Sequence, residues 1–472
     1  MIKIPIVTAY TPLNKVILTI LRGLMRVLSL FVGKTWATPP PYFHDDPRHY
    51  TFKDIVFFAY KYYFKPPSKS ENTEGVENFF QDHPPIFSLP NLPVQSTVTI
   101  TAAGDLMPYE WIQQPYCTHL WDDIADDFFS SDICFANLET PIDPSKPASL
   151  VPEMMLSHML FNGDKQMFDI FNGQNYQTKT VKNKGFDILS TANNHSLDMG
   201  EQGVEATIDF LKERNILHVG TSKNDVKHGD FSIIERNDIK IAFISYTFSM
   251  NQFTNPSDKK WLVNHLEVNQ AEVDLSILKQ DVANAKAQNA DFIVLSLHYG
   301  NAYQAYPGVH IVENTKRIFE ECGVDVILGT HAHNVQPMAA YPFTCPHTGV
   351  DKRGFVIFSM SDFIAYDIFN ACHLSVYLKL TLSKMASKTE NTEGVSSDSH
   401  YVILTDVKAI PVYACGNYFS REKRDLRLLN AYKTVDLIEK KDIPSYMTAW
   451  NVRELTGLMA FYKSFFQKNI PS

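Results

Sequence analysis

Residues 324–337, VDVILGTHAHNVQP, decide the fold. The stretch opens with an apolar, largely β-branched run, which predicts a buried strand that ends at Gly329. His331 and His333 follow, one residue apart; in a continuing strand they would point to opposite faces, but in a loop both can turn to one point. Loops beyond the carboxyl ends of strands are where α/β folds place their sites, and imidazole is a common metal ligand. The stretch therefore predicts an α/β fold with a metal site, against the simpler interpretation of two surface-loop histidines.

Composition bounds the class of protein. The 472 residues suffice for one large α/β domain with extensions, or for two domains, and 44% hydrophobic residues can bury a sizeable core. A net charge of −9 argues against a nucleic-acid partner, because no basic field would hold phosphates. The six cysteines are scattered without a CxxC pair, which indicates reduced, buried thiols rather than disulfides or a cysteine zinc site.

Residues 1–95 are expected to form a helical and linker extension. An apolar run over residues 16–33 predicts a helix, and the polar residues of this region recur every three or four positions: Lys15, Thr19, Arg22, Arg26 and Ser29. Such a basic stripe is typical of an amphipathic helix on an anionic membrane surface, here through residues 15–33, although a helix docked on its own protein fits equally well. A cleaved signal peptide is disfavoured because arginines interrupt the apolar run. Residues 50–64 predict a second helix, and residues 66–82 an exposed linker.

Residues 96–382 repeat one pattern, in which an apolar strand ends in a polar residue that can bind a metal. The predicted strands cover residues 97–103, 132–138, 185–194, 291–297 and 355–360. The polar residues that follow the first four of them are Asp105, Glu139, Asn194 with His195, and His298. Each of these alone is as well explained by a turn, a helix cap or a salt bridge. Together with His331 and His333 they form a mixed nitrogen and oxygen set that suits a pair of divalent ions such as Mn²⁺, Fe²⁺ or Zn²⁺.

His195 and Asp198 suggest acid–base chemistry beside that set. A histidine can protonate a leaving group or bind a phosphoryl oxygen, and a nearby carboxylate can orient its imidazole. The same letters, ANNHSLD, also build an ordinary helix-capping turn.

Six segments in this order resemble the poly-γ-glutamate capsule biosynthesis (CapA) family, a branch of the calcineurin-like metallophosphatase superfamily. The resemblance covers roughly residues 97–365 and is carried by AAGDLM (102–107), FANLETPI (135–142), ANNHSLDMGEQG (192–203), LHYGNAY (297–303), GTHAHNVQP (329–337) and FSMSDF (358–363).

The resemblance implies a fold, a set of ligands and a reaction class. The fold would be α/β, a two-sheet sandwich of the metallophosphoesterase type flanked by helices. The implied metal ligands are Asp105, Glu139, Asn194, His298, His331 and His333, the implied catalytic residues are His195 and Asp198, and the implied substrate contacts are Asn193, Tyr303, Gln336 and Asp362. The substrate would be a small molecule or an anionic polymer.

The chain departs from the family pattern at four places. Met107 stands where the wider superfamily has a histidine ligand, so one metal position is short of a ligand. Ala302 replaces a glutamate that usually precedes the tyrosine of its motif, Asp362 replaces an asparagine, and residues 108–111 lack an expected arginine.

Residues 383–472 are expected to pack on the catalytic domain. A polar surface loop over residues 384–400 precedes a strand over 401–412 and helices over 425–441 and 445–467.

The sequence thus favours a metal-dependent hydrolase of the phosphoesterase type, membrane-associated or cytoplasmic in a bacterium. The alternative is a weakly catalytic or non-catalytic, membrane-associated component of poly-γ-glutamate synthesis or export.

Overall fold

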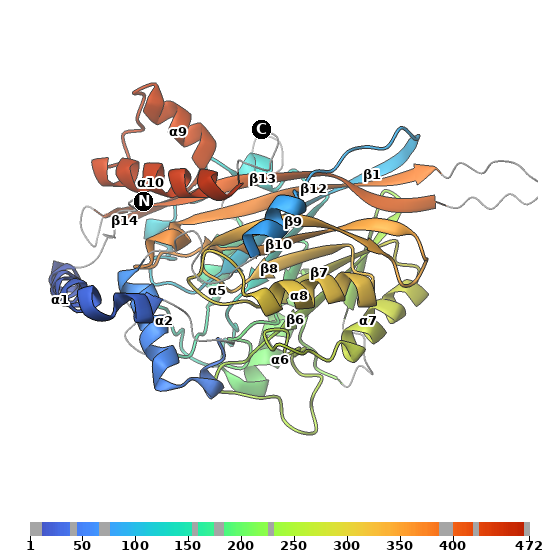
Figure 1. The fold of residues 1–472 in the computed structure, drawn as a ribbon, viewed down its shortest axis with the longest axis horizontal. Coiled ribbons are helices and arrows are strands. Elements are labelled where there is room, and N and C mark those ends of the chain that lie inside the picture. The colour runs from blue at the N-terminus through green and yellow to red at the C-terminus, as the bar shows by residue number, and fades with distance from the viewer. Residues whose placement is uncertain are drawn as a thin grey trace, which may run out of the picture.

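Two β-sheets packed face to face form the centre of the protein in the computed structural model (Figure 1). The structure describes residues 12–37, 45–65, 76–152, 159–173, 184–224, 231–386, 400–418 and 424–466. The first sheet has the order β14 (Arg424–Asn430), β13 (His400–Tyr418), β12 (Leu374–Ala386), β1 (Val94–Leu106), β2 (Ile133–Leu138), β3 (Ile188–Ser190) and β4 (Leu217–Val219), with β11 (Asp362–Ile364) beside β1. The second has the order β5 (Phe231–Arg236), β6 (Ile239–Thr247), β7 (Phe292–His298), β8 (Val326–Thr330), β10 (Asp351–Met360) and β9 (Val335–Thr344).

Parallel strands form one half of the first sheet, out to its edge strand β4, and the middle of the second sheet. In the first sheet β1, β2, β3 and β4 run parallel, and in the second β6, β7, β8 and β10 do so. Strands buried on both faces read as continuous apolar runs, as FIVLSL in β7 does. The carboxyl ends of the parallel strands therefore gather polar loops from both sheets.

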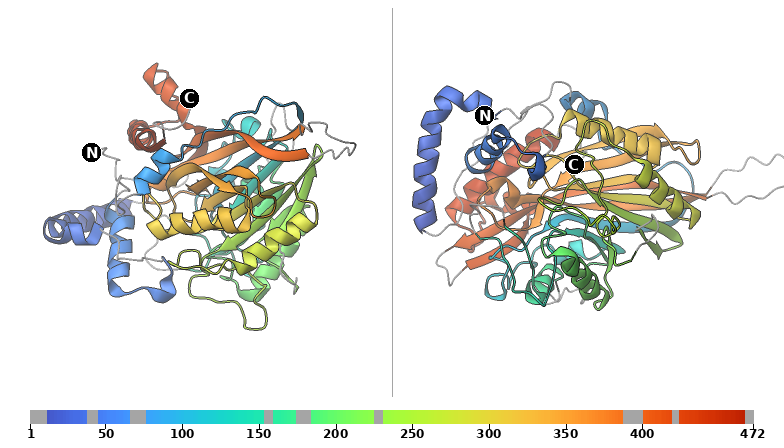
Figure 2. Two further views of the ribbon diagram at one scale, coloured as in Figure 1. Left: turned by 45° about the vertical axis from the view of Figure 1, so that its right-hand side comes forward. Right: turned by 90° about the horizontal axis from the view of Figure 1, so that it is seen from below.

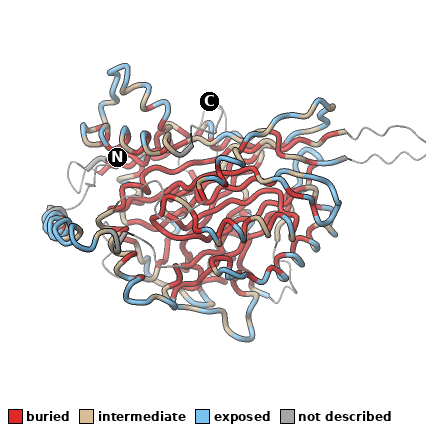
Figure 3. The backbone as a smooth tube through the Cα atoms, viewed as in Figure 1, coloured by how far each residue is buried: buried red, intermediate tan, exposed pale blue. Residues whose placement is uncertain are grey.

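The main core lies between the sheets. Phe135 of β2 stacks on Phe243 of β6, and Ile100 and Leu328 belong to the same buried cluster. A second cluster covers the outer face of the first sheet beneath α4 (Ala125–Phe128), α5 (Lys165–Phe171) and α6 (Gly200–Lys212). A third covers the outer face of the second sheet beneath α3 (Val76–Asp82), α7 (Ser276–Ala287) and α8 (Val309–Arg317), which continues as a π-helical turn, Ile318–Cys322. Figure 3 shows the strands buried under these layers. The predicted two-sheet α/β sandwich flanked by helices is confirmed.

Two helices of the N-terminal extension lie at one end of the sandwich. In both views of Figure 2, α1 (Pro12–Ala37) extends along the periphery, and α2 (Phe52–Phe64) connects it to the body. Leu18 of α1 is buried, and Arg22 donates from Nε to the carbonyl oxygen of Tyr63 at 3.1 Å. Arg22, one of the two arginines of the predicted polar stripe, thus faces the protein. Apolar residues such as Leu30 and Phe31 are 81% and 84% exposed.

Two predictions about secondary structure were wrong. Residues 76–82, expected in an exposed linker, form α3, because the apolar side chains of Val76, Phe79 and Phe80 share one helical face that packs on the second sheet. Residues 425–430, expected to begin a helix, belong to strand β14, because alternate side chains, Leu426 and Leu428, are buried and the backbone pairs with β13. The linker residues 66–75 and most of the polar loop, 387–399, lie outside the described residues.

The C-terminal helices are fixed to the sandwich. Helices α9 (Ala431–Glu439) and α10 (Ala449–Phe466) pack on β13, whose neighbour β12 spans the expected boundary at residue 382. The proposed division at 95 and 382 stays a prediction. On α10 the buried Glu454 accepts hydrogen bonds from Asn370 and from Tyr413 Oη at 2.6 Å, and its Oε1 lies 3.1 Å from Nδ1 of His373.

Replacing Glu454 by Ala should destabilise the protein by about 3 kcal/mol, because the buried donors that bond to its carboxylate would lose their acceptor. Urea unfolding would measure the change. Its exposed helix neighbour offers a control: Arg453→Ala should alter the free energy of unfolding by no more than about 0.5 kcal/mol. Equal small effects of both substitutions would contradict a structural role for Glu454.

Candidate metal centre

The carboxyl ends of five parallel strands bring the sequence-predicted ligands together. Asp105 lies near the end of β1, Glu139 directly follows β2, and Asn194 lies in the turn after β3. These three come from the first sheet, whereas His298 ends β7 and His331 directly follows β8 of the second sheet. The site therefore exists only where the two sheets meet.

Three further possible ligand atoms surround Nε2 of His298. Nε2 of His298 lies 2.9 Å from Oδ1 of Asn194, 3.2 Å from Nδ1 of His331 and 3.7 Å from Oε1 of Glu139. Ligands about 2.0–2.2 Å from a shared transition-metal ion lie roughly 3–3.5 Å from one another. The spacing of these two nitrogens and two oxygens fits one such ion.

Glu139 supplies the most direct test of that fit. Its side chain is 0% exposed, and neither carboxylate oxygen accepts a hydrogen bond from any described residue. Burial, followed by the charges of Asp105 and Asp362, raises the pKa of Glu139 well above its usual value. A buried carboxylate without donors is costly unless a cation compensates it. Glu139 therefore fits a divalent ion better than any role in folding.

Neighbouring side chains orient the ligands. Nδ1 of His298 lies 2.9 Å from Oγ1 of Thr330, so its Nε2 faces the other ligands. Asn194 donates from Nδ2 to Oδ1 of Asn251 at 3.2 Å, so the side-chain oxygen of Asn194 also faces the other ligands. Burial, with the nearby His331, His333 and His195, lowers the pKa of His298 well below its usual value. His298 is thus neutral at pH 7, the form that binds metals.

A second group of ligands lies beside the first. Asp105 is within 4.8 Å of Glu139 and His298, and it accepts hydrogen bonds from Asn137 Nδ2 at 2.7 Å and from the His331 amide at 3.0 Å. Burial and the charge of Asp362 raise the pKa of Asp105 to about 6. This carboxylate is positioned to share an ion with Glu139.

His333 lies close enough to Asp105 for its charge to lower the pKa of that carboxyl. Its Nδ1 lies 2.9 Å from Asp362, and although burial opposes it, the charge and hydrogen bond of Asp362 raise the pKa of His333 to about 9. Met107, at the position of the missing histidine, is buried in the apolar cluster on the outer face of the first sheet. Among the described residues, Asp105 and Glu139 are the carboxylates of this second position, and His333 as its third ligand stays a prediction.

Left-handed backbone conformations concentrate around the site. His331 and His333 have φ of 87° and 57°, Ser361 after β10 has 68°, and Tyr303 and Asn251 have 62° and 53°. Non-glycine residues rarely adopt these angles, and such strain clusters at functional sites where the surroundings enforce it. At His331 and His333 this conformation turns both imidazoles away from the strand direction.

His195 and Asp198 form a hydrogen-bonded pair at the edge of the cluster. Nδ1 of His195 lies 2.6 Å from Oδ2 of Asp198, which also accepts from the Phe161 amide at 2.7 Å. The Phe161 ring stacks on the imidazole with centroids 3.7 Å apart. This arrangement fixes the imidazole plane, and an acid–base role for His195 stays a prediction.

The four predicted substrate contacts have different environments. Asn193 is buried and donates to the Leu138 carbonyl at 2.8 Å, while Gln336 is buried and donates to the Gln304 carbonyl at 2.9 Å. The Tyr303 ring stacks on the His333 imidazole with centroids 5.2 Å apart, and Oδ1 of Asp362 contacts Nδ1 of the same imidazole. Tyr303 and Asp362 therefore line the second metal position, and a substrate role for all four stays a prediction.

Sequence reasoning missed the residues that hold the ligands in place. Asn137 and Thr330 are polar residues inside apolar strands, a signal that could have revealed them. Asn251 lies in a turn without such a pattern, and Asp45 comes from the N-terminal extension, where nothing in the sequence links it to the site.

The comparison with protein-family models gives a match to the bacterial capsule synthesis protein PGA_cap over residues 99–367, more than half of the chain. The chain belongs to this family. The resemblance stated from its motifs is thereby confirmed. Relatives include capsule biosynthesis protein CapA of Bacillus anthracis, 27% identical over 39% of this chain and 42% of that one, and PGA biosynthesis protein CapA of Bacillus subtilis, 25% identical over 50% and 58%. The matched region thus spans about half the length of these capsule-family relatives.

Solved structures resemble this member of the capsule synthesis family more distantly. A calcineurin-like phosphoesterase, YfkN from Bacillus subtilis, covers 79% of this chain and 98% of its own at 14% identity, with a TM-score of 0.36. A hypothetical protein from Thermus thermophilus covers 65% and 100% at 13% identity, with a TM-score of 0.33. The two-sheet arrangement of this capsule-family chain rests on its own strand pairings.

Elemental analysis of the purified protein should find at least one transition-metal ion per chain. Asp105→Asn and His331→Ala should each reduce that content strongly, because each removes a ligand from the centre. Asp164→Asn is a suitable control, since Asp164 only caps helix α5 by accepting from the Met167 amide. Equal metal content in all four proteins would contradict the assignment of the centre.

Proposed function

We propose that this protein is a metal-dependent hydrolase of the metallophosphoesterase type. The observation that carries the proposal is the buried Glu139 carboxylate: among the described residues it has no hydrogen-bond donor, and it lies 3.7 Å from Nε2 of His298, which also contacts Asn194 and His331. Family membership supports a role in capsule synthesis, and the names of the CapA relatives support a poly-γ-glutamate pathway. The substrate would be an anionic polymer or one of its smaller precursors.

Divalent ions, when bound, would supply Lewis acidity toward a phosphoryl or acyl oxygen and lower the pKa of water. Glu139, Asn194, His298 and His331 would hold one ion; Asp105, Glu139 and His333 would hold a second, more weakly because Met107 adds no ligand. Mn²⁺, Fe²⁺ and Zn²⁺ match this nitrogen and oxygen set better than Ca²⁺ does.

His195 would act as the general acid. Its Nδ1 bonds Asp198, so proton transfer to a leaving group would involve Nε2, and Phe161 would keep the ring plane fixed during that transfer. Asp198 would stabilise the imidazolium and hold its tautomer.

Replacing His195 by Asn should lower kcat about 100-fold or more while metal content stays unchanged, because the variant loses proton transfer but no ligand. Hydrolysis of aryl phosphomonoesters and phosphodiesters in added Mn²⁺ measures the effect. The loss should grow with the leaving-group pKa, so phenyl esters should suffer more than p-nitrophenyl esters. Equal losses on both would rule out the general-acid role.

A second candidate function is a weakly catalytic or non-catalytic component of polymer synthesis or export at the membrane. It is favoured by the shortage of ligands at the second metal position and by helix α1, whose segment Val16–Gly33 is long and apolar enough to cross a membrane. Bound metal without turnover of phosphoesters or of poly-γ-glutamate would decide for this function.

We expect α1 to attach the protein to lipid. The double variant Leu30→Lys/Phe31→Lys should bind vesicles at least about tenfold more weakly, because each apolar side chain contributes about 1.5–3 kcal/mol on burial. Co-sedimentation with vesicles containing anionic lipid measures the binding. Deletion of residues 1–35 should have a larger effect, and unchanged binding after that deletion would exclude the attachment.

A further inference from the structure

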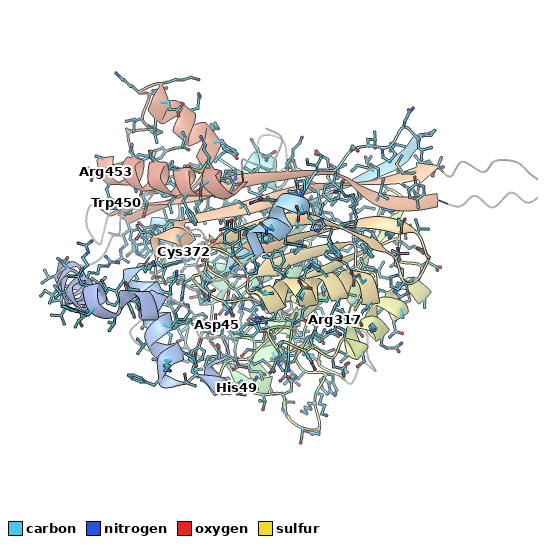
Figure 4. The ribbon with its side chains drawn as sticks, in the orientation of Figure 1. Asp45, His49, Arg317, Cys372, Trp450 and Arg453 are labelled. Carbon is cyan, nitrogen blue, oxygen red and sulfur yellow. The ribbon has the colours of Figure 1, made fainter. Side chains whose placement is uncertain are left out.

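One carboxylate of the centre comes from outside the family-matched region. Asp45 belongs to the N-terminal extension, yet it is 3% exposed and lies within the body of the protein, where Figure 4 labels it. Its Oδ2 lies 3.1 Å from Nε2 of His331 and accepts a hydrogen bond from the Ala302 amide at 2.5 Å. Its Oδ1 accepts a hydrogen bond from the Tyr50 hydroxyl.

The two ring nitrogens of His331 have opposite partners. Nδ1 faces Nε2 of His298 at 3.2 Å, inside the ligand set, whereas Nε2 faces Asp45. A neutral imidazole carries one N–H. With that N–H donated to Asp45, the lone pair of Nδ1 points at the other ligands. Metal-binding histidines commonly donate their second N–H to a carboxylate in this way.

We infer that Asp45, contributed by the N-terminal extension, is a positioning residue for His331. The inference rests on the proposed metal-binding function. Asp45 would not bind the ion itself; it would set the tautomer, the orientation and the basicity of a ligand that does.

The surrounding structure holds Asp45 in place. Its φ of 56° lies in the left-handed region, which aspartate tolerates better than most residues. Asp46 beside it caps the short helix Pro47–His49 and pairs with Arg48. The carboxylate also joins two loops of the second sheet, since Ala302 follows β7 and His331 follows β8.

Helix α2 carries the same connection further. Its Phe58 and Tyr62 rings pack on Tyr303 with centroids 5.1 and 5.0 Å apart, and Tyr62 donates to Asp367 at 2.7 Å. Tyr303 in turn stacks on His333. The N-terminal segment therefore contacts both loop histidines of the centre, His331 through Asp45 and His333 through Tyr303.

The test compares the Mn²⁺ affinity of the full-length protein with that of Asp45→Asn, measured by competition with a chelator. Asp45→Asn should weaken Mn²⁺ binding on the order of 10- to 100-fold, because the neutral amide no longer supports the His331 N–H. Asp46→Asn is the matched control, since among the described residues the Asp46 side chain bonds to Arg48 of its own short helix. The Mn²⁺ affinity of this variant should stay within twofold of the original. Asp45→Glu should recover part of the loss.

Thermal unfolding in the presence of EDTA separates positioning from simple structural support. If Asp45 only ties two loops together, Asp45→Asn would lower the unfolding temperature in EDTA and leave the Mn²⁺ affinity unchanged, which would overturn the inference. Should Asp45→Asn fail to fold, Tyr50→Phe removes one hydrogen bond from the same carboxylate and should weaken Mn²⁺ binding in the same direction; unchanged affinity there would also overturn it. Normal Mn²⁺ binding by Asp105→Asn and His331→Ala would instead refute the metal centre itself.

Discussion

The buried carboxylate of Glu139 is the constraint on which the site depends. It lies between two sheets, it has no hydrogen-bond donor among the described residues, and Asp105 places a second carboxylate close by. Burial is the main cause of the raised pKa values of both groups, and repulsion among the buried carboxylates, Asp362 included, adds to it. The neutral His298 cannot relieve that repulsion, because burial and the neighbouring histidines keep its pKa low. A divalent ion would satisfy all of these groups at once, so the packing of the two sheets is coupled to cation binding.

That coupling explains the unusual backbone around the strand ends. The fully buried strands β7 and β8 run parallel and carry His298 and His331 to adjacent positions, but side chains in register on parallel strands do not converge on one point without help. The left-handed conformations of His331 and His333 provide the turn. The hydrogen bond that the His331 amide donates to Asp105 and the one that Ser361 Oγ donates to the His333 carbonyl hold it. The local strain is therefore balanced by contacts that cross from one sheet to the other.

The parts of this arrangement that could be predicted from the sequence are those that depend on residues close together in the chain. Apolar runs followed by Asp105, Glu139, Asn194, His298 and His331 located the strand ends, since each strand and its ligand are neighbours in the chain. The short helix α3 and the strand β14 were missed because polar neighbours masked the spacing of a few apolar side chains. The orientation of the ligand side chains could not be predicted, because it depends on residues far away in the chain. Which nitrogen of His298 faces the cluster depends on Thr330, 32 residues away, and the environment of His331 depends on Asp45, 286 residues away.

Asp45 also bears on how the family pattern and this chain differ. Position 302, where the resemblance leads one to expect a glutamate, holds an alanine, and the carboxylate of Asp45 accepts a hydrogen bond from its backbone amide. The region that matches the family thus lacks an acidic side chain at this loop, and the N-terminal extension places one against it. Because Leu18 of the exposed apolar helix α1 packs in the same cluster as Tyr62 and Tyr303, the extension connects an exposed apolar surface to residues beside the candidate metal centre. The proposed attachment to lipid and the proposed positioning of His331 would then both depend on the N-terminal extension.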